Sequence, residues 1–303
     1  MYSLASINVG VYMLGEIEST IDRESLCRRI LNLIHINDVN IICTQEYVLI
    51  ESSHSTCSEF KSIYESYGYT LVTQDILDTC KSRTVQSKYP SKRVYIGNVI
   101  YVRSNLISKV QVLLTKPSRA PACMAQIRFD NIEIANVHLC GGRFDDIKVF
   151  TKANFFRSKV DSIKSINHSI ICGDFNATRN LGEPGGLRNF KYPLQLCKQT
   201  GCNIDSSIIH LWNTWQFSPI NFFYDNNYKS CFNDDQLDII SETSSRGHYV
   251  VDWVFYDSTK VNKRDSHCEP MYNDTRMLSD HHMLMFTFST SINAENRGKS
   301  YYV

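Results

Sequence analysis

Short runs of apolar residues, separated by polar and turn-forming segments, recur along most of the chain. Runs of this length that are rich in Val, Ile, Tyr and Phe are typical of β-strands. We expect strands at Ser3–Val9, Val39–Thr44, Tyr69–Thr73, Val94–Val102, Gln111–Leu114, Cys123–Phe129, Ile132–Leu139, Ser169–Cys172, Tyr249–Tyr256 and Met283–Phe288.

Three segments between these runs have a helical pattern instead. In Asp22–Ile36, apolar residues such as Leu26 and Ile30 recur at the spacing of one helix face. Ser58–Tyr67 and Asp146–Ile166 are further candidate helices. The order strand, helix, strand at the start of the chain predicts a βαβ unit with parallel strands. Later strands follow one another through short connections, which favours antiparallel pairing.

This order of elements predicts an α/β fold with mixed sheets. We expect one domain over residues 1–290 and a polar C-terminal tail over residues 291–303. Residues 177–248 are rich in Asn, Ser and aromatic residues, and we expect long surface loops there.

Composition narrows the class of protein. The 303 residues include 43% hydrophobic and 21% charged residues, which is ordinary for a globular protein with a large core. No run of about 18 apolar residues occurs, so we expect no membrane span. The N-terminus lacks the basic and apolar regions of a secretory signal. The 11 cysteines form no CxxC pair, which disfavours a zinc ribbon, and we expect reduced thiols and an intracellular location, cytoplasmic or nuclear.

Charge is unevenly distributed although the formal net charge is only +1. No acidic residue lies between Asp78 and Asp130, whereas that stretch holds ten basic residues. The rest of the chain has the other 22 of the 32 basic residues and all 31 acidic residues. This segregation indicates either a surface that meets phosphates or an ordinary solvated face. We favour the phosphate-binding interpretation.

Polar side chains that can do chemistry cluster where the predicted strands end. Each of them alone fits a turn, a cap or a hydrogen-bonded core residue, but a set carried on strand ends is typical of a rigid catalytic site. The set comprises Asn8, Gln45-Glu46, His138, Gly173-Asp174-Phe175-Asn176, Asp252 and Ser279-Asp280-His281. If the strand stays extended through Phe175, the side chains of Asp174 and Asn176 point the same way.

In this order, the set resembles the endonuclease/exonuclease/phosphatase superfamily, which has the DNase I-like fold. The resemblance spans residues 3–288, and GDFN followed far downstream by SDH is its most specific part. Gly97-Asn98-Val99-Ile100 is similar to the family's central strand, and Ser118-Arg119-Ala120-Pro121 to its arginine turn. The resemblance implies a four-layer α-β-β-α sandwich with two packed mixed sheets, the active site lying at one end of the sheets.

The resemblance also implies a role for each matching residue. A hard carboxylate suits Mg²⁺, so Glu46 is the first candidate ligand, with Asn8 and Asp280 completing or supporting the shell and Mn²⁺ as an alternative metal. Asp174 would orient or deprotonate the attacking water, and Asn176 would bind phosphoryl oxygens. His281, oriented by Asp252, would contact the scissile phosphate, and His138 would add a second imidazole. We further assign substrate binding to Arg119, Arg93, Lys92, Arg143 and Trp212.

The branch of the superfamily is less defined, although DNase I and the tyrosyl-DNA phosphodiesterases have the closest pattern. AP endonucleases of the exonuclease III type carry Tyr-x-Pro-Asn where this chain has Asn136-Val137-His138-Leu139. The basic stretch and the aromatic loop residues favour nucleic acid, DNA before RNA, as the partner, with no protein partner evident. The expected function is therefore a Mg²⁺-dependent nuclease or DNA-end-processing enzyme, as in DNA repair. A phosphatase or phospholipid-headgroup phosphodiesterase, and an inactive nucleic-acid-binding relative, are the alternatives.

Overall fold

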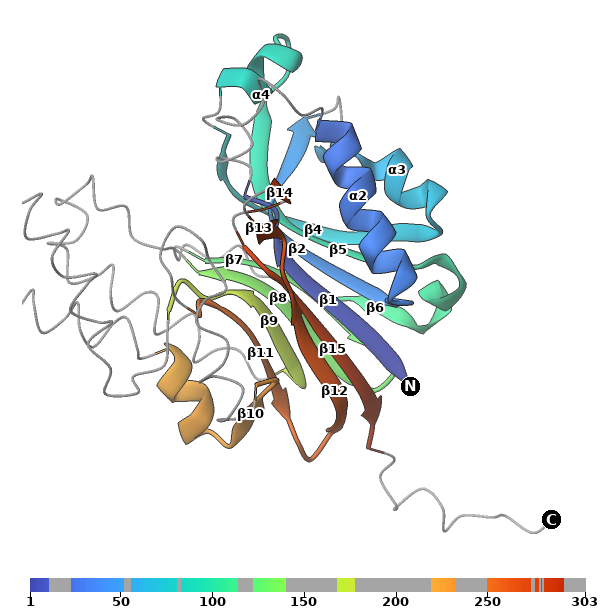
Figure 1. The fold of residues 1–303 in the computed structure, drawn as a ribbon, viewed down its shortest axis with the longest axis vertical. Coiled ribbons are helices and arrows are strands. Elements are labelled where there is room, and N and C mark those ends of the chain that lie inside the picture. Colours follow the sequence, from blue (N-terminus) through green and yellow to red (C-terminus); the bar gives the residue numbers. More distant parts are fainter. Residues whose placement is uncertain are drawn as a thin grey trace, which may run out of the picture.

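Two β-sheets packed face to face form the centre of the protein (Figure 1). In this computed structural model, the residues that the structure describes are 1–10, 23–51, 56–80, 83–113, 122–139, 168–177, 219–232, 250–273, 276–277, 279 and 281–291. The seven-stranded sheet is named sheet A, and the six-stranded sheet is named sheet B.

Sheet A is built around a parallel pair of strands, β1 and β2, with antiparallel strands on either side. Its strand order is β12-β15-β1-β2-β5-β4, and β3 pairs with β2. The strands are β1 (Tyr2–Asn8), β2 (Ile41–Glu51), β3 (Thr56–Ser58), β4 (Tyr69–Thr79), β5 (Val94–Arg103), β12 (Val261–Glu269) and β15 (Met283–Thr290).

Sheet B has the same plan, with the parallel pair β8 and β9 at its middle. Its strand order is β10-β11-β9-β8-β7-β6. The strands are β6 (Val110–Val112), β7 (Ala122–Phe129), β8 (Ile132–Leu139), β9 (Ile170–Asp174), β10 (Tyr228–Ser230) and β11 (Asp252–Asp257). A separate two-stranded hairpin contains β13 (Tyr272–Asn273) and β14 (Arg276–Met277).

Helices cover the outer faces of the sheets. α2 (Arg23–Ile36) and α3 (Lys61–Ser66) lie over sheet A, and α2 buries its apolar stripe against that sheet (Figure 1). α4 (Arg83–Lys88) and the 3-10 helix η1 (Ser104–Lys109) flank β5. Over sheet B lies a helix at residues 219–225, whose Phe223 ring stacks on Phe255 at 4.8 Å between centroids.

Between the sheets the core is apolar and aromatic. Tyr2 of sheet A meets Phe129 of sheet B edge to face at 4.8 Å, and Tyr256 of sheet B meets Phe286 of sheet A at 5.3 Å. Strand residues two apart share a face, so this layer is filled by alternate residues of each strand. This close packing makes the two sheets a rigid support for the side chains at the strand ends.

The expected mixed sheets are confirmed, and several element boundaries move. β2 does not end at Thr44 but continues to Glu51, and β4 continues to Thr79 rather than ending at Thr73. β11 begins at Asp252, three residues after the predicted start. The predicted helix Asp146–Ile166 lies outside the described residues.

Several elements had no counterpart in the prediction, among them β10 and the helix at residues 219–225, which lie where long surface loops were expected, and also β12 and α4. β12 is an edge strand whose sequence, VNKRDSHCE, has many charged and polar residues and so lacks the apolar signal. α4 lies within the basic stretch and is only six residues long. None of the helices in the described parts of the chain has the length and apolar character that a membrane crossing requires.

Candidate functional site

Three adjacent strands of sheet B bring three polar side chains together at one end of the sandwich. Asp174, the last residue of β9, pairs with His138 on the parallel strand β8. On its other side, Asp174 pairs with Asp252, the first residue of the antiparallel strand β11. The register of sheet B therefore places an imidazole and two carboxylates side by side, although they are far apart in the sequence.

The carboxylate of Asp174 is held on both oxygens. Asn8, at the end of β1, donates from Nδ2 to Oδ2 of Asp174 at 3.0 Å, and the backbone N–H of Asn176 donates to Oδ1 at 2.7 Å. The side chain of Asn8 is itself fixed, since its Oδ1 accepts from the N–H of Gly10 at 2.9 Å. Asp174 is only 2% exposed. These bonds fix the orientation of the carboxylate.

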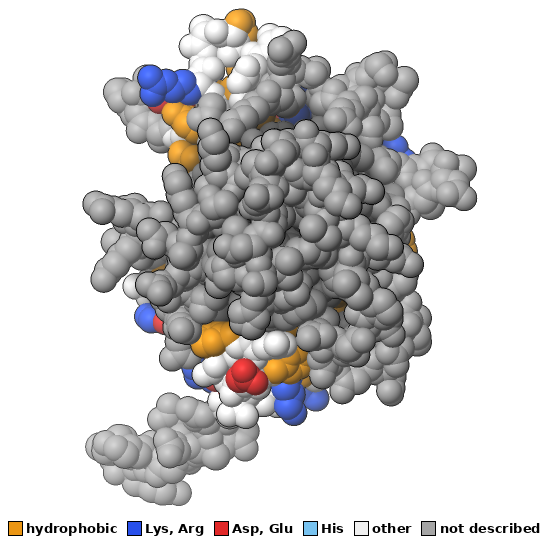
Figure 2. Space-filling model, turned by 90° about the vertical axis from the view of Figure 1, so that its left-hand side faces the viewer, with side chains coloured by type: hydrophobic (Ala, Val, Ile, Leu, Met, Phe, Trp, Pro, Cys, Tyr) orange, Lys and Arg blue, Asp and Glu red, His pale blue; other side chains and the backbone are white. Residues whose placement is uncertain are grey.

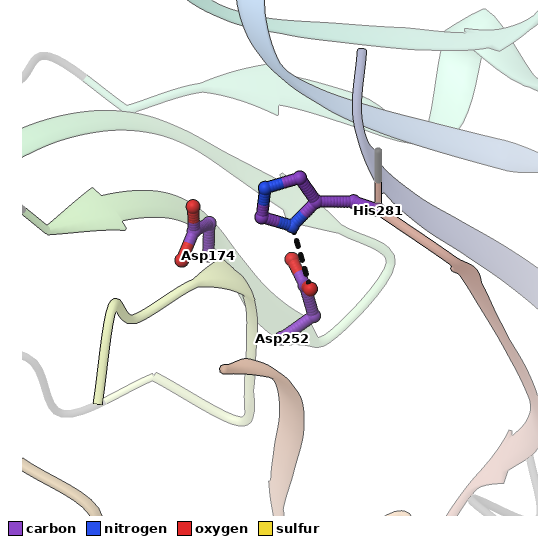
Figure 3. A group of neighbouring side chains, drawn as sticks. All are labelled: Asp174, Asp252 and His281. Carbon is purple, nitrogen blue, oxygen red and sulfur yellow. Dashed lines mark hydrogen bonds and ion pairs between the residues drawn. The ribbon is translucent and has the colours of Figure 1, made fainter. Parts of the chain in front are cut away.

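Asp252 and His281 form the second half of the site. Nδ1 of His281 lies 2.8 Å from Oδ2 of Asp252, a hydrogen bond that fixes both the tautomer and the ring plane. Figure 3 shows the imidazole above the Asp252 carboxylate, with Asp174 to one side of this pair. One carboxylate oxygen of each Asp and one ring nitrogen of His281 lie within 4.8 Å of one another.

Ser279 ties this half of the site to sheet A. Its hydroxyl donates to the backbone carbonyl of Asn8 at 2.5 Å and accepts from the N–H of His281 at 3.1 Å. The segment before β15 is thus anchored at the end of β1, next to the side chain that holds Asp174. Ser279 belongs to the SDH motif, but nothing in the motif indicated that this serine anchors the segment.

Glu46 reaches the site from a bulge in the middle of β2, not from a strand end as predicted. The pairing of β2 with β5 shifts register between Thr44 and Tyr47, and Glu46 has a left-handed φ of 52°. A bulge of this kind re-aims a side chain. Oε1 of Glu46 lies 3.9 Å from Nε2 of His138, which in turn lies 3.7 Å from Oδ2 of Asp174. His138 therefore stands between the carboxylates of the two sheets.

The donor set fits a hard divalent cation. Glu46 and Asp174 offer oxygen atoms on either side of His138, and Asp252 adds a third carboxylate that is 2% exposed. Burying like charges this close together is costly unless a cation offsets them. Mg²⁺ and Mn²⁺ prefer such oxygen ligands. Glu46, Asp174 and Asp252 are the residues that would hold the metal, and His281 belongs to the same group.

Two of the thiols near the site, Cys268 and Cys43, remain protonated. Burial, with neighbouring Asp252 next in effect, raises the pKa of Cys268 to about 12. Burial, reinforced by the adjacent Cys172, also raises the pKa of Cys43 between the sheets well above its usual range. A protonated thiol is neither a good nucleophile nor a good metal ligand. The chemistry of the site therefore rests on oxygen and imidazole groups.

Asn176 does not continue the extended strand. The prediction that Asn176 points the same way as Asp174 depended on an extended strand through Phe175. Asn176 has a left-handed φ of 46°, and its Nδ2 donates to the carbonyl of Leu139 at 2.8 Å. Phe175 before it is fully buried and packs on the outer face of sheet B against Phe223. Asn176 thus closes the gap between the ends of β8 and β9 and holds Asp174 through its backbone.

The structure describes only some of the predicted substrate-binding residues. Lys92 and Arg93 are exposed just before β5, and Arg93 lies 3.9 Å from Glu51. The remaining predicted binding residues and one predicted metal ligand lie outside the described residues: Arg119, Arg143, Trp212 and Asp280.

Part of the basic stretch is paired with acids where the structure describes it. Arg103 pairs with Asp38 at 2.9 Å, and Arg128 pairs with Glu133 at 2.6 Å, both at the end of the sheets away from Asp174. Lys109 likewise lies 3.4 Å from Asp130. On the face in Figure 2, the visible Lys and Arg side chains lie apart from one another. Arg103, Lys109 and Arg128 are thus paired with acids that lie outside the basic stretch.

The residues beneath the site stand in the motifs quoted from the sequence, but no role was predicted for them. Gln45, Asn98 and Asn136 are fully buried amides between the sheets. One signal was available, because Asn136 interrupts the apolar strand IEIANVHL two positions before His138 and so shares its face.

Comparison with known proteins agrees with this geometry. A model of the Endonuclease/Exonuclease/phosphatase family matches residues 6–281. The chain belongs to this family. Members of the family are generally metal-dependent phosphoesterases, and this member has a candidate metal site of two aspartates and a histidine. No curated protein sequence matches the chain at a significant level.

Solved structures of the family share the fold. The catalytic domain of human Nocturnin with bound sulfate is 18% identical, with 96% of this chain and 93% of that chain covered and a TM-score of 0.57. The 3′ phosphatase NExo from Neisseria, bound to a product DNA hairpin, is 12% identical at 95% and 100% coverage and a TM-score of 0.54. An AP endonuclease from Archaeoglobus fulgidus is 13% identical at 95% and 99% coverage and a TM-score of 0.52. At these identities the likeness concerns the fold alone.

Proposed function

We propose that this family member is a Mg²⁺-dependent phosphodiesterase that hydrolyses nucleic acid, DNA in preference to RNA. The observation that carries the proposal is the doubly held Asp174 carboxylate beside the Asp252–His281 pair, with Glu46 facing Asp174 across His138. Two structural neighbours also support a nucleic-acid substrate, since one is an AP endonuclease and another is a phosphatase bound to DNA.

Asp174 is the group that we assign to the attacking water. Hydrogen bonds from Asn8 and from the Asn176 N–H hold its oxygens, so the carboxylate keeps one orientation. A fixed carboxylate can accept a proton from a water molecule and direct the remaining lone pair at phosphorus. Holding base and water in place removes the entropy cost of bringing them together during the reaction.

His281 is the group that we assign to the phosphate. Asp252 holds Nδ1 of the ring, which leaves Nε2 as the atom that can donate to a phosphoryl oxygen when the ring carries both protons. Asp252 also stabilises positive charge on the ring as negative charge accumulates on the phosphate oxygens. His138, between Glu46 and Asp174, would act on the same charge from the other side.

The metal, when bound, supplies positive charge that offsets the repulsion between an anionic phosphodiester and the attacking oxygen. Glu46 from sheet A and Asp174 and Asp252 from sheet B are the residues that would hold it.

Hydrolysis of end-labelled DNA and RNA oligomers, measured with Mg²⁺ and with EDTA, tests the proposal. We expect cleavage in Mg²⁺, loss of cleavage in EDTA, and a rate at least 100-fold lower in Asp174→Asn. Asp130→Asn is the matched control, because it makes the same change at an acid paired with Lys109 at the far end of the sheets. Full activity in EDTA or in Asp174→Asn would refute the mechanism.

Two further measurements separate the alternatives. Cleavage of bis(p-nitrophenyl) phosphate or a phospholipid headgroup, without cleavage of either oligomer, would replace nucleic acid by a smaller phosphoester. Oligomer binding that weakens steeply with salt, without turnover, would indicate an inactive binding relative.

A further inference from the structure

A layer of buried amides lies between the two sheets, directly beneath the site. Gln45 and Asn98 from sheet A and Asn136 from sheet B are fully buried. The neighbouring inter-sheet layers consist of apolar side chains such as Ile100 and Ile134. Buried amides are costly unless they are hydrogen-bonded, so a layer of them must be accounted for by its contacts.

Asn136 makes those contacts across the gap between the sheets. Its Nδ2 donates to the backbone carbonyls of Thr44 at 2.9 Å and Val99 at 3.0 Å. Its Oδ1 accepts from Nε2 of Gln45 at 2.6 Å. Its own backbone carbonyl accepts from Nδ2 of Asn98 at 2.9 Å. Both donors of the amide and its acceptor are therefore in use.

These contacts fall at the bulge that carries Glu46. Thr44 and Val99 are the last paired residues of β2 and β5 before the register shifts, and pairing resumes at Tyr47. Asn136 thus bonds the two carbonyls at the edge of the interruption and the side chain of Gln45, the first residue inside it. At the bulge the regular pairing of β2 with β5 is interrupted, and the side chain of Asn136 from sheet B makes hydrogen bonds there instead.

We propose that Asn136 is a positioning residue, which holds the Glu46 bulge of sheet A in register with His138 of sheet B. The reason lies in how the site is divided, because Glu46 comes from one sheet and His138 and Asp174 from the other. Apolar packing between the sheets is not directional, whereas hydrogen bonds fix distance and angle. Asn136 and His138 lie two residues apart on the same face of β8, so one short segment contacts both sides of the site.

The inference deepens the proposed function and rests on it, so its main readout is metal binding and not turnover. Mn²⁺ is titrated into the purified protein, and its binding is followed by electron paramagnetic resonance. For Asn136→Leu, which keeps the approximate size but removes all three side-chain hydrogen bonds, we expect Mn²⁺ to bind at least tenfold more weakly. The Mg²⁺ concentration for half-maximal cleavage should rise by a similar factor.

Ile134→Ala is the matched control, since Ile134 is fully buried on the same face of β8, two residues further from the site. It should lower the free energy of unfolding while leaving the Mn²⁺ affinity within about twofold of the wild type. Gln45→Met is the second variant if Asn136→Leu does not fold, and it removes the amide that bonds Oδ1 of Asn136. We expect an intermediate loss of Mn²⁺ affinity for it.

Three results would overturn the inference: unchanged Mn²⁺ affinity in the folded amide variants, an equal loss in Ile134→Ala, or a wild-type protein that does not bind Mn²⁺. A wild-type protein that binds Mn²⁺ tightly but cleaves no phosphodiester refutes the proposed function alone. In that case, a tenfold loss of affinity in Asn136→Leu still supports the positioning role.

Discussion

Gly173, the residue before Asp174, lies where the backbone of β9 packs closely against the backbone of β8. Its φ is +136°, and a Cβ atom placed there would lie 1.9 Å from the carbonyl oxygen of Val137 on the neighbouring strand β8. Real Cβ contacts are essentially never shorter than 3.0 Å, so β8 and β9 would have to separate by about 1 Å. The pair affected is next to the pair of His138 and Asp174.

For Gly173→Ala we expect a loss of about 2–6 kcal/mol in the free energy of unfolding. An alanine at this φ costs roughly 1–3 kcal/mol of backbone strain. Forced separation of the strands adds about 1–3 kcal/mol, as in other overpacked sites. Because Asp174 is the next residue, we also expect cleavage to fall at least tenfold in the fraction that remains folded.

Gly68→Ala separates the two contributions. Gly68 also has a positive φ, +80°, but nothing lies within 4 Å of the position of its Cβ. This variant should therefore lose only the strain, about 1–2 kcal/mol. Urea unfolding followed by circular dichroism gives both values. If Gly173→Ala is no more destabilising than Gly68→Ala, the steric argument fails.

Three further predictions concern buried charges. Burial lowers the pKa of His168 below the usual value of about 6.5, so its contribution to stability is present above that pH and is lost as the pH falls. Urea unfolding at pH 7.5 and 5.5 should show a smaller loss for His168→Phe than for the wild type, and equal losses would contradict this. Asp252→Asn should lower kcat at least 100-fold with KM little changed, because the amide favours the wrong histidine tautomer; a kcat within threefold of the wild type would count against that role. Glu59→Gln breaks an ion pair with Arg23 in which both side chains are under 5% exposed, and should cost about 3–5 kcal/mol. Lys61→Ala, which removes one partner of an exposed ion pair, should lower the free energy of unfolding by less than about 1 kcal/mol. A similar loss for Glu59→Gln and Lys61→Ala would contradict the argument that burial makes the first ion pair the more important one.

The apolar pattern predicted most of the fold because it reports burial directly. Ile132–Leu139 was located with both its boundaries, and the helix over Asp22–Ile36 was off by one residue. The pattern failed at β12, where a charged edge strand has little apolar surface to bury. It also ended β2 at Thr44, since the polar pair Gln45-Glu46 looks like the start of a loop.

The sequence by itself determined which side chains are available for the chemistry. A carboxylate or an imidazole at the end of an apolar strand is visible in the sequence, because the strand's own pattern shows where burial stops. Asn8, His138 and Asp174 were found in this way, whereas Asp252 was expected inside the strand Tyr249–Tyr256; the structure places all four at one end of the sandwich.

Only the tertiary structure decided how these side chains are aimed and which charges remain available. Glu46 faces the site because of a bulge that contacts Asn136 of the other sheet, a relation between residues 90 positions apart. Arg103 and Arg128, which suggested a basic surface, are paired with acids from other segments. Hydrogen bonds and ion pairs depend on distances of a few ångströms between segments, and such distances are set by sheet register and inter-sheet packing, not by local sequence.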